Sequence, residues 1–413
     1  MGSQKRCCWH PAGHREPFQI ALLRNQILVI LLLLAAILSA NQSCASPTAL
    51  QNSFESISQR AESARKADHV NDAIRLYREA LHLRPGWQQG WLWLGNLLYD
   101  QDRFPEAHDA FAHFVLAVPQ PGPVWAMKGL CEFEMQDYKS ALADLETWVH
   151  GGFHGSDELT DVAAFHWALL LTRERRFAQA LFVLTDRANR KGESPMLVEA
   201  MGLAALRIAN LPSEYPQQLR EPVWLAGKAA FFSSQHDFAR SQEYGHRLLT
   251  AYSQTPNVHY FCGTLLNFQL KHEDAALEFR QELQLSPQHV PSLLELAQIE
   301  IDSYQIPEAV TLSRQAAEVE LTNYDTHVVL GRALLAAGQL NESMEQLETA
   351  RRLAPEVAAI HYHLAEAYRR MGRKEEAQRE MSTYLSLGKK KGGALNAPYN
   401  APVRQLSAGR QSE

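Results

Sequence analysis

The chain has 413 residues, of which 46% are apolar and 21% are charged, and its formal net charge is −6 with the histidines neutral. These fractions are typical of a folded globular protein and exclude a disordered chain. The acidic balance argues against nucleic acid as a partner. The length suits two or three ordinary domains or one elongated repeat array.

The first 45 residues differ from the rest. Basic residues precede an apolar run from Ile27 to Leu38, and the small residues Ser43 and Ala45 follow it. The run has about the length of a signal-peptide core and is short for a membrane span. We therefore expect residues 1–45 to be a signal peptide that directs export to the periplasm or cell envelope. The alternative is an uncleaved inner-membrane anchor with the body outside, so membrane contact is expected only through this segment.

A polar, proline-containing stretch, residues 46–53, is predicted to be a linker. After it, one pattern dominates the chain, and its clearest copy spans residues 88–119. Apolar residues at helical spacing predict two helices, a glycine lets them approach closely, and a proline ends the second helix. The residues of the pattern are Trp91, Leu94, Gly95 and Leu98, then Ala107 and Phe111, then Pro119.

The pattern recurs at a fixed interval. Copies begin at residues 54, 88 and 122, and again at 256, 290, 324 and 358, with 34 residues between neighbours in each series. The close-packing position of the last four copies holds Gly263, Ala297, Gly331 and Ala365. A single helix pair cannot bury its apolar face alone, so stacked copies are expected. The sequence predicts an all-α solenoid of about nine helix pairs.

The middle of the chain breaks the interval. A helix is expected over residues 196–208, with Gly202 at its close-packing position, but no second helix follows it. Three prolines between Leu211 and Pro222 forbid a continuous helix there. We expect an ordered proline-rich connector, residues 209–222, between an N-terminal array (54–208) and a C-terminal array (223–388). The interface at the connector is expected to be the weakest in the chain and the first to be cut by protease. Residues 389–413 are predicted to be a disordered tail.

The repeated pattern resembles the tetratricopeptide-repeat family, whose signature is W-x₂-L-G-x₂-Y…A-x₃-F…P, over about 340 residues. The chain as a whole also resembles exported tetratricopeptide proteins of Acidobacteria, whose middle section carries a comparable Leu-Pro-Ser-Glu…Glu-Pro connector. The family resemblance implies a right-handed superhelix of antiparallel helix pairs. It also implies a concave surface, formed by the first helix of each pair, that binds proteins or peptides without chemistry.

The resemblance further implies which residues line that groove. The second, fifth, ninth and twelfth positions of each copy face it in the family. Asparagine can pair with a peptide backbone through one donor and one acceptor, and tyrosine offers broad contact at low entropic cost. The alternative is that these are ordinary solvated helix positions. The groove residues so assigned are Gln89, Asn96, Tyr99, Phe133, Tyr260, Asn267, Arg332, Tyr362, Glu366 and Arg369.

One known binding mode of the family is disfavoured. Its members that grip the C-terminal carboxylate of chaperone tails use lysine, asparagine and arginine at set positions. Asn96 matches one of them, but Leu92 stands where the lysine belongs, and Met127 stands where the next asparagine belongs.

Catalysis, cofactors and metals find little support. The loop from His150 to Glu158 carries two histidines and two acids, which are metal-ligand types, but we interpret it as a glycine-rich repeat junction. His259, His327 and His361 occupy one repeat position, that of the signature tryptophan, and are interpreted as packing residues. No nucleophile elbow, phosphate-binding loop or paired-cysteine zinc motif is found, so no catalytic residue, cofactor or metal is predicted.

The cysteines predict no disulfide. Cys131 and Cys262 fall in different repeats, and a disulfide requires Cα atoms within about 7 Å. Both are expected to be small buried residues.

The sequence thus favours a non-catalytic scaffold of the bacterial cell envelope that binds protein or peptide. A rival interpretation is a glycan-binding accessory protein or enzyme partner of the cell wall, in which sugars stack on aromatic side chains. The rings available for that role are Tyr99, Phe133, Tyr260 and Tyr362. The identity of the partner and the oligomeric state are not predicted.

Overall fold

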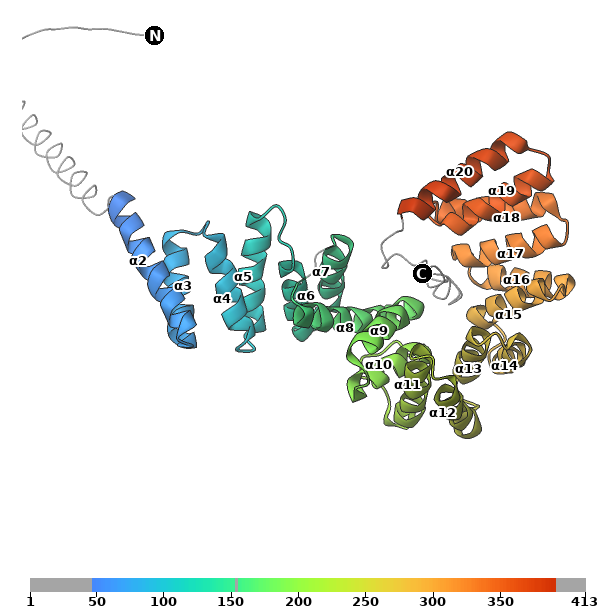
Figure 1. Cartoon of the computed structure of the whole chain (residues 1–413), viewed down its shortest axis with the longest axis horizontal. Coiled ribbons are helices and arrows are strands. Elements are labelled where there is room, and N and C mark those ends of the chain that lie inside the picture. The colour runs from blue at the N-terminus through green and yellow to red at the C-terminus, as the bar shows by residue number, and fades with distance from the viewer. Residues whose placement is uncertain (1–46, 153–154, 391–413) are drawn as a thin grey trace, which may run out of the picture. The chain divides into compact units, whose positions relative to one another are not determined.

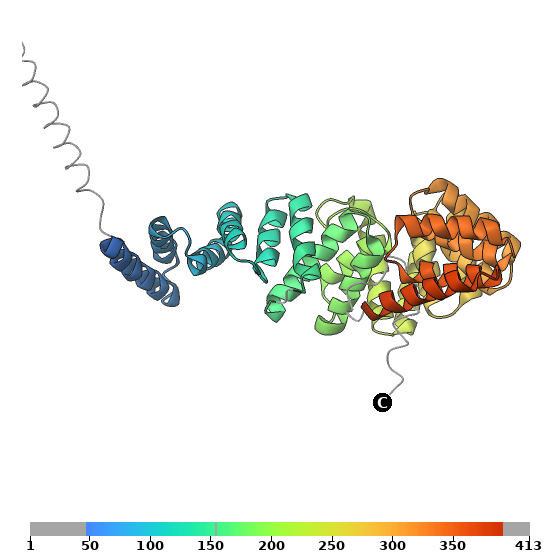
Figure 2. The same cartoon turned by 90° about the horizontal axis from the view of Figure 1, so that it is seen from above.

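The computed structural model describes residues 47–152 and 155–390. The predicted leader (1–45) and nearly all of the predicted tail lie outside these residues. Over the described residues the chain forms nineteen α-helices and one short 3₁₀ helix, without strands, which confirms the all-α prediction (Figures 1 and 2). It divides into two compact units at Ala117–Val118. They are called unit 1 and unit 2 below.

Unit 1 consists of two helix pairs whose bounds are α2 (Pro47–Lys66), α3 (Val70–Leu83), α4 (Gln88–Tyr99) and α5 (Phe104–Ala117). Helix α2 begins at Pro47, so the predicted linker over residues 46–53 is wrong from residue 47 onward. Proline is favoured in the first turn of a helix, and the Ala, Leu and Gln residues that follow are good helix formers. Phe54, where the first copy was expected to begin, is buried within this longer helix.

Unit 2 begins with two further pairs, and their bounds are α6 (Val124–Glu134), α7 (Tyr138–His150), α8 (Asp157–Arg173) and α9 (Phe177–Lys191). Three helices and the 3₁₀ helix η1 (Gln217–Leu219) form its middle, with bounds α10 (Pro195–Ala205), α11 (Arg220–Ser234) and α12 (Phe238–Tyr252). Four pairs complete it, and their bounds are α13 (Val258–Phe268), α14 (His272–Leu285), α15 (Val290–Asp302), α16 (Ile306–Val319), α17 (Tyr324–Ala336), α18 (Leu340–Leu353), α19 (Ala358–Arg370) and α20 (Lys374–Lys390). Because α20 runs to Lys390, residues 389–390 are helical and not part of a disordered tail.

The close-packing glycines lie where the repeat register requires. A Cβ atom added to Gly263 would lie 2.7 Å from the ring of Phe279, and one added to Gly331 would lie 2.7 Å from Leu347. In both pairs the partner follows sixteen residues later, on the second helix. Each glycine therefore allows close contact between the two helices of its pair, as predicted.

The turns inside the pairs repeat with the same interval. One residue at each turn has a positive φ, and in regular copies these residues are 34 apart. Its N–H and that of the next residue close the preceding helix through backbone hydrogen bonds, as Asp102 and Arg103 do after α4. The residues at this position are Asp68, Asp102, Gln136, Arg175, His236, Leu270, Tyr304, Gly338 and Gly372.

The middle of unit 2 differs from the sequence interpretation. Helix α10 does have a helical partner, because α11 packs directly on it while also pairing with α12. A Cβ atom on Gly202 of α10 would overlap the carbonyl oxygen of Val223, and one on Gly227 of α11 would overlap that of Val198. Helix α11 is accordingly buried along most of its length. The expectation that α10 lacks a second-helix partner is wrong. The interface at the connector was expected to be the weakest for that reason alone, so this expectation loses its basis.

The connector itself is an ordered part of unit 2. Leu211 is buried, the Tyr215 hydroxyl donates a hydrogen bond to Glu199 at 2.6 Å, and Glu214 forms an ion pair with Arg173 at 2.7 Å. These contacts tie the connector to α8 and α10. The boundary between the compact units lies at Ala117–Val118 and not at this segment.

Two further sequence expectations concern burial and membranes. Cys131 and Cys262 are both buried and unpaired, as predicted. Among the helices of the described ranges, none combines the length and apolar character needed to cross a membrane.

Candidate functional site

The first helices of the last four pairs present a connected polar surface in unit 2, called here the first-helix face. It is formed by α13, α15, α17 and α19. Asn267 of α13 donates a hydrogen bond to Glu295 of α15 at 3.2 Å. Arg332 of α17 donates one to Gln298 of α15 at 3.1 Å. Two of the predicted groove residues, Asn267 and Arg332, thus contact the neighbouring first helix on this face.

The C-terminal part of this face combines opposite charges around a neutral histidine. Burial, and secondarily the positive charge of Arg332, lower the pKa of His363 to about 3. Hydrogen bonds from Arg369 and Arg370 lower the pKa of Glu366 to about 2. At neutral pH this part of the face therefore presents a neutral imidazole, an ionised carboxylate and guanidinium groups.

Two predicted residues here are open to solvent. The Tyr362 side chain is 45% exposed, and its ring packs against Tyr384 with 5.5 Å between ring centres. Arg369 is exposed one turn beyond Glu366, with which it forms an ion pair of 2.7 Å. An incoming chain can reach both side chains without displacing core packing.

Tyr260 lies at the N-terminal end of α13 and is partly buried. Its ring centre is 5.1 Å from that of His289 and 6.0 Å from that of Phe279. The guanidinium carbon of Arg207 lies 5.6 Å from the ring centre. The tyrosine is therefore held by aromatic and cationic neighbours and presents a fixed surface.

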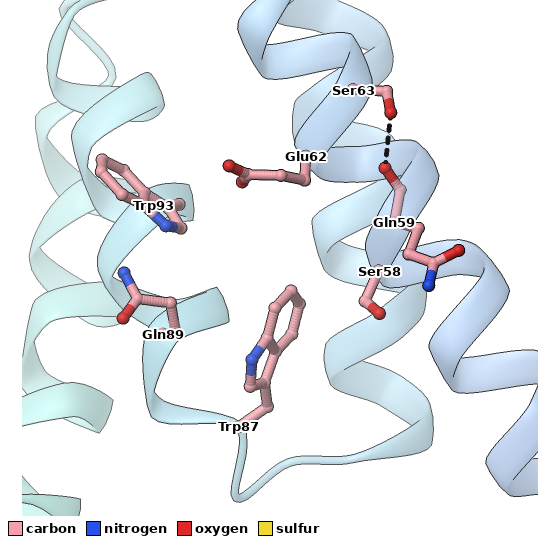
Figure 3. A pocket seen from close by; sticks show the side chains of 7 residues that line it. All are labelled: Ser58, Gln59, Glu62, Ser63, Trp87, Gln89 and Trp93. Atoms are coloured by element: carbon pink, nitrogen blue, oxygen red, sulfur yellow. Dashed lines mark hydrogen bonds between the residues drawn. The ribbon is translucent and has the colours of Figure 1, made fainter.

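A second candidate surface is a hollow of about 710 Å³ between α2 and α4 in unit 1 (Figure 3). The side chains that line it are Ser58, Gln59, Glu62, Ser63, Trp87, Gln89 and Trp93. Gln89 is the predicted groove residue that the structure places here. Figure 3 shows Glu62 reaching from α2 toward Trp93, with Trp87 rising from the base of α4.

The polar groups of this hollow are strongly coupled. A hydrogen bond from Arg65 lowers the pKa of Glu62 to about 2, and the Tyr77 hydroxyl also donates to this carboxylate at 2.9 Å. The Arg65 guanidinium lies 3.9 Å from the centre of the Trp93 ring. Sequence reasoning missed Glu62 and Trp93. Trp93 follows the predicted groove residue Gln89 by four positions, and this spacing places both on one face of the helix.

The remaining predicted residues lie apart. Asn96 is on α4, and its side-chain oxygen is buried without a hydrogen-bond partner. The Tyr99 ring packs edge-on against Phe104 at 5.5 Å. Phe133 belongs to α6 of unit 2, where its ring packs against His166 at 4.6 Å. Asn96 and Tyr99 therefore share α4 with Gln89, whereas Phe133 belongs to a helix of the other unit.

Two segments of the chain match family models described as tetratricopeptide repeat, residues 58–120 and residues 334–390. The first contains the Trp91–Phe111 signature, and the second contains the last residues of α17 and the helices α18, α19 and α20 of unit 2. These segments are tetratricopeptide repeats. The family implied by the sequence pattern is confirmed at this level, whereas the likeness to acidobacterial proteins stays a prediction.

Several solved structures share partial similarity with the chain. A MamA RS-1 double mutant is 16% identical, with a TM-score of 0.39 over 42% of this chain and 97% of that one. MamA from Desulfovibrio magneticus RS-1 is 19% identical, with a TM-score of 0.36 over 41% and 98%. YrrB, described as a tetratricopeptide protein with an unusual peptide-binding site, is 17% identical, with a TM-score of 0.36 over 43% and 92%. No curated protein matches the chain.

Two of the three histidines at the signature-tryptophan position, His327 and His361, make the hydrogen bond that the tryptophan makes in another repeat. In the second tetratricopeptide repeat, the Trp91 indole N–H donates to the carbonyl oxygen of Pro85, six residues earlier, at 2.8 Å. His361 Nε2 lies 2.8 Å from the carbonyl oxygen of Pro355, also six residues earlier, and must donate to it. His327 makes the equivalent bond at 2.9 Å. All three histidines, His259 included, are buried, as their interpretation as packing residues requires.

The loop after α7 shows no ligand set in the described residues. His150 Nδ1 lies 2.7 Å from the carbonyl oxygen of Glu146 in its own helix. The second histidine, His154, lies outside the described ranges. Among the residues that the structure describes, no group of three metal-ligating side chains is gathered.

Proposed function

We propose that this chain is a scaffold of the bacterial cell envelope that binds a protein or peptide along the first-helix face of unit 2. Tetratricopeptide repeats are interaction modules, and this supports a binding role in general. The first-helix face is proposed as the location because it combines solvent access with several recognition chemistries. The observation that carries it is the placement of Asn267, Arg332, Tyr362 and Glu366 on three first helices of one continuous stack.

The chemistry of the face suits an extended peptide. Asn267 and Gln298 can each offer one donor and one acceptor to a peptide bond. Tyr362 provides a large, rigid contact that loses little entropy on binding. The internal hydrogen bonds of Asn267 and Arg332 with the neighbouring helix hold these side chains in place before a partner arrives, which lowers the cost of ordering them.

A binding experiment tests this proposal. The full chain, produced in bacterial cells and immobilised, is used to capture partners from envelope extract, and each captured protein is then titrated against purified variants. Tyr362→Ala should weaken binding of a genuine partner by about 1 kcal/mol or more. The matched control is Tyr304→Ala, because Tyr304 is 87% exposed and lies in the α15–α16 turn. If both variants lose affinity equally, or if neither loses affinity, the partner does not bind at the first-helix face.

The glycan alternative is tested with the same variants. The full chain is incubated with isolated peptidoglycan and sedimented. Co-sedimentation that Tyr362→Ala abolishes and Tyr304→Ala preserves would replace the peptide proposal with a cell-wall one.

Export is proposed from the leader alone. Its basic residues, apolar run and small residues support a signal peptide. N-terminal sequencing of the protein from the periplasmic fraction should give a start between Asn41 and Ser46. Recovery of the intact leader from washed membranes would instead support the anchor.

A further inference from the structure

Arg207 lies between two aromatic rings that come from distant parts of unit 2. It follows α10 at the turn, with a φ of 54°. Its guanidinium carbon is 4.8 Å from the ring centre of Phe177, the first residue of α9, and 5.6 Å from that of Tyr260 in α13. Each ring attracts the cation through its π face, so the two rings restrict where the guanidinium can go.

This arginine lacks a carboxylate partner in the described part of the chain. Other partly buried arginines that lie over a ring are paired: Arg65 with Glu62, Arg173 with Glu214, and Arg187 with Asp161. Arg207 has five N–H donors and, within the described ranges, neither an ion pair nor a side-chain hydrogen bond. A guanidinium that is partly removed from water and unpaired favours an anion that can accept two of these N–H groups.

The polar groups near Arg207 are paired with other partners and do not bind its guanidinium. His289 Nδ1 lies 3.3 Å from the Ser292 N–H and accepts from it, so Nε2 carries the proton and donates to Asn257 at 3.0 Å. Glu282, a fully buried carboxylate on α14, accepts hydrogen bonds from the backbone N–H groups of Asn257 and Tyr260. This carboxylate therefore already accepts hydrogen bonds at both of its oxygens.

We propose that Arg207 is a carboxylate-binding group beside the first-helix face, which it reaches through Tyr260. The inference rests on the proposed scaffold function and specifies its partner: a peptide that carries a carboxylate, either an acidic side chain or a free C-terminus. The two rings hold the guanidinium so that its N–H edge receives the carboxylate in a two-point contact. Arg207 belongs to the turn before the connector and not to a groove position implied by the family.

Nuclear magnetic resonance of the full chain labelled with ¹⁵N-arginine tests the site without a peptide. The Arg207 Nε–Hε signal is assigned by its loss in Arg207→Lys. Two probes separate the sources of the carboxylate: N-acetylglutamate N-methylamide carries only a side-chain carboxylate, and N-acetylglycine carries only a terminal one. We expect one probe to shift the Arg207 signal to saturation, with an apparent affinity that falls as salt is raised.

Arg247 is the matched control. Its guanidinium lies 5.3 Å from the Tyr244 ring centre, also without a carboxylate partner in the described residues, but the side chain is exposed on α12. Its Nε–Hε signal should not saturate. A linear drift of the Arg207 signal, or the same response from both arginines, would overturn the carboxylate site.

The partner provides the second arm. Arg207→Gln should lower the affinity of the chain for an isolated partner peptide by on the order of tenfold, and Arg247→Gln should leave this affinity unchanged. Replacing the peptide carboxylate with an amide should produce the same loss in the wild type and none in Arg207→Gln. The melting temperatures of both variants establish that they fold.

The failures of the two proposals are distinguishable. If partner binding depends on Tyr362 but not on Arg207, the scaffold proposal stands and the carboxylate site is overturned. Saturable probe binding at Arg207 without any partner on the first-helix face retains an anion site but overturns its role in peptide recognition.

Discussion

Gly202 and Gly227 make reciprocal contacts across the α10–α11 interface. Each glycine approaches the carbonyl oxygen of a valine on the opposite helix so closely that a Cβ atom would overlap it, Gly202 at Val223 and Gly227 at Val198. In both helices the valine precedes the glycine by four residues, so the two helices present the same small surface to each other. The connector joins the end of α10 to the start of α11.

Alanine at either glycine should destabilise unit 2. The atoms that a new methyl group would meet are backbone atoms, so the helices must separate, and we expect a loss of about 1–3 kcal/mol or more in the free energy of unfolding. Gly388→Ala in α20 is the control, since nothing lies within 4 Å of the site of its Cβ. Chemical denaturation of the three variants measures the difference. Unchanged stability in Gly202→Ala and Gly227→Ala would mean that α10 and α11 do not pack as described.

Gly331→Leu tests the register of the last repeats. A Cβ there already lies 2.7 Å from Leu347, and the Ser343 hydroxyl donates to the Gly331 carbonyl oxygen at 2.7 Å across the same contact. Leucine should cost about 1–3 kcal/mol by overpacking. A circular-dichroism melt that matches the wild type would be incompatible with the α17–α18 contact.

Tyr304 and Gly338 occupy the same turn position one repeat apart, with φ values of 61° and 77°. A side chain is disfavoured in this conformation, whereas glycine adopts it freely. Tyr304→Gly should therefore stabilise the protein by up to about 1 kcal/mol, and Gly338→Ala should destabilise it by about 1 kcal/mol. The two unfolding free energies are measured side by side. Changes of the same sign would contradict a shared turn geometry.

His289 predicts a pH dependence of stability. Burial, and secondarily the positive charge of Arg207, lower its pKa in the folded state to about 4, below the value of about 6.5 expected when unfolded. The contribution of His289 to the free energy of unfolding should be complete above about pH 6.5. It should be lost as the pH falls toward 4, because protons then bind the unfolded state preferentially. The penalty of His289→Gln should consequently be larger at pH 7 than at pH 4. A penalty that does not vary over this range would contradict the burial of a neutral imidazole.

The repeat register was readable from the sequence because it depends on local spacing. A small residue, a bulky partner sixteen positions later and a turn every 34 residues are all set within one helix pair. This is why the contacts of Gly263 and Gly331, and the packing role of His361, agree with the prediction.

The features that sequence reasoning missed depend on contacts between distant segments. The α10–α11 pair depends on Gly202 and Gly227, which lie on either side of a proline-rich stretch, and the sequence analysis did not identify Gly227 as a close-packing position. Arg207 is an ordinary turn residue in the sequence, and only the fold brings Phe177 and Tyr260 to it. Trp93 was missed because the family positions assign the groove to other residues of α4.

Site-specific photocrosslinking can show whether a partner binds on the first-helix face. A photoreactive amino acid is placed at Tyr362 on the first-helix face or at Tyr304 in the α15–α16 turn of the full chain, and cells are irradiated. We expect one defined crosslinked partner from position 362, absent from position 304 and reduced by a second substitution, Arg332→Ala. Equal crosslinking from both positions, or a partner captured only from position 304, would contradict a binding site on the first-helix face.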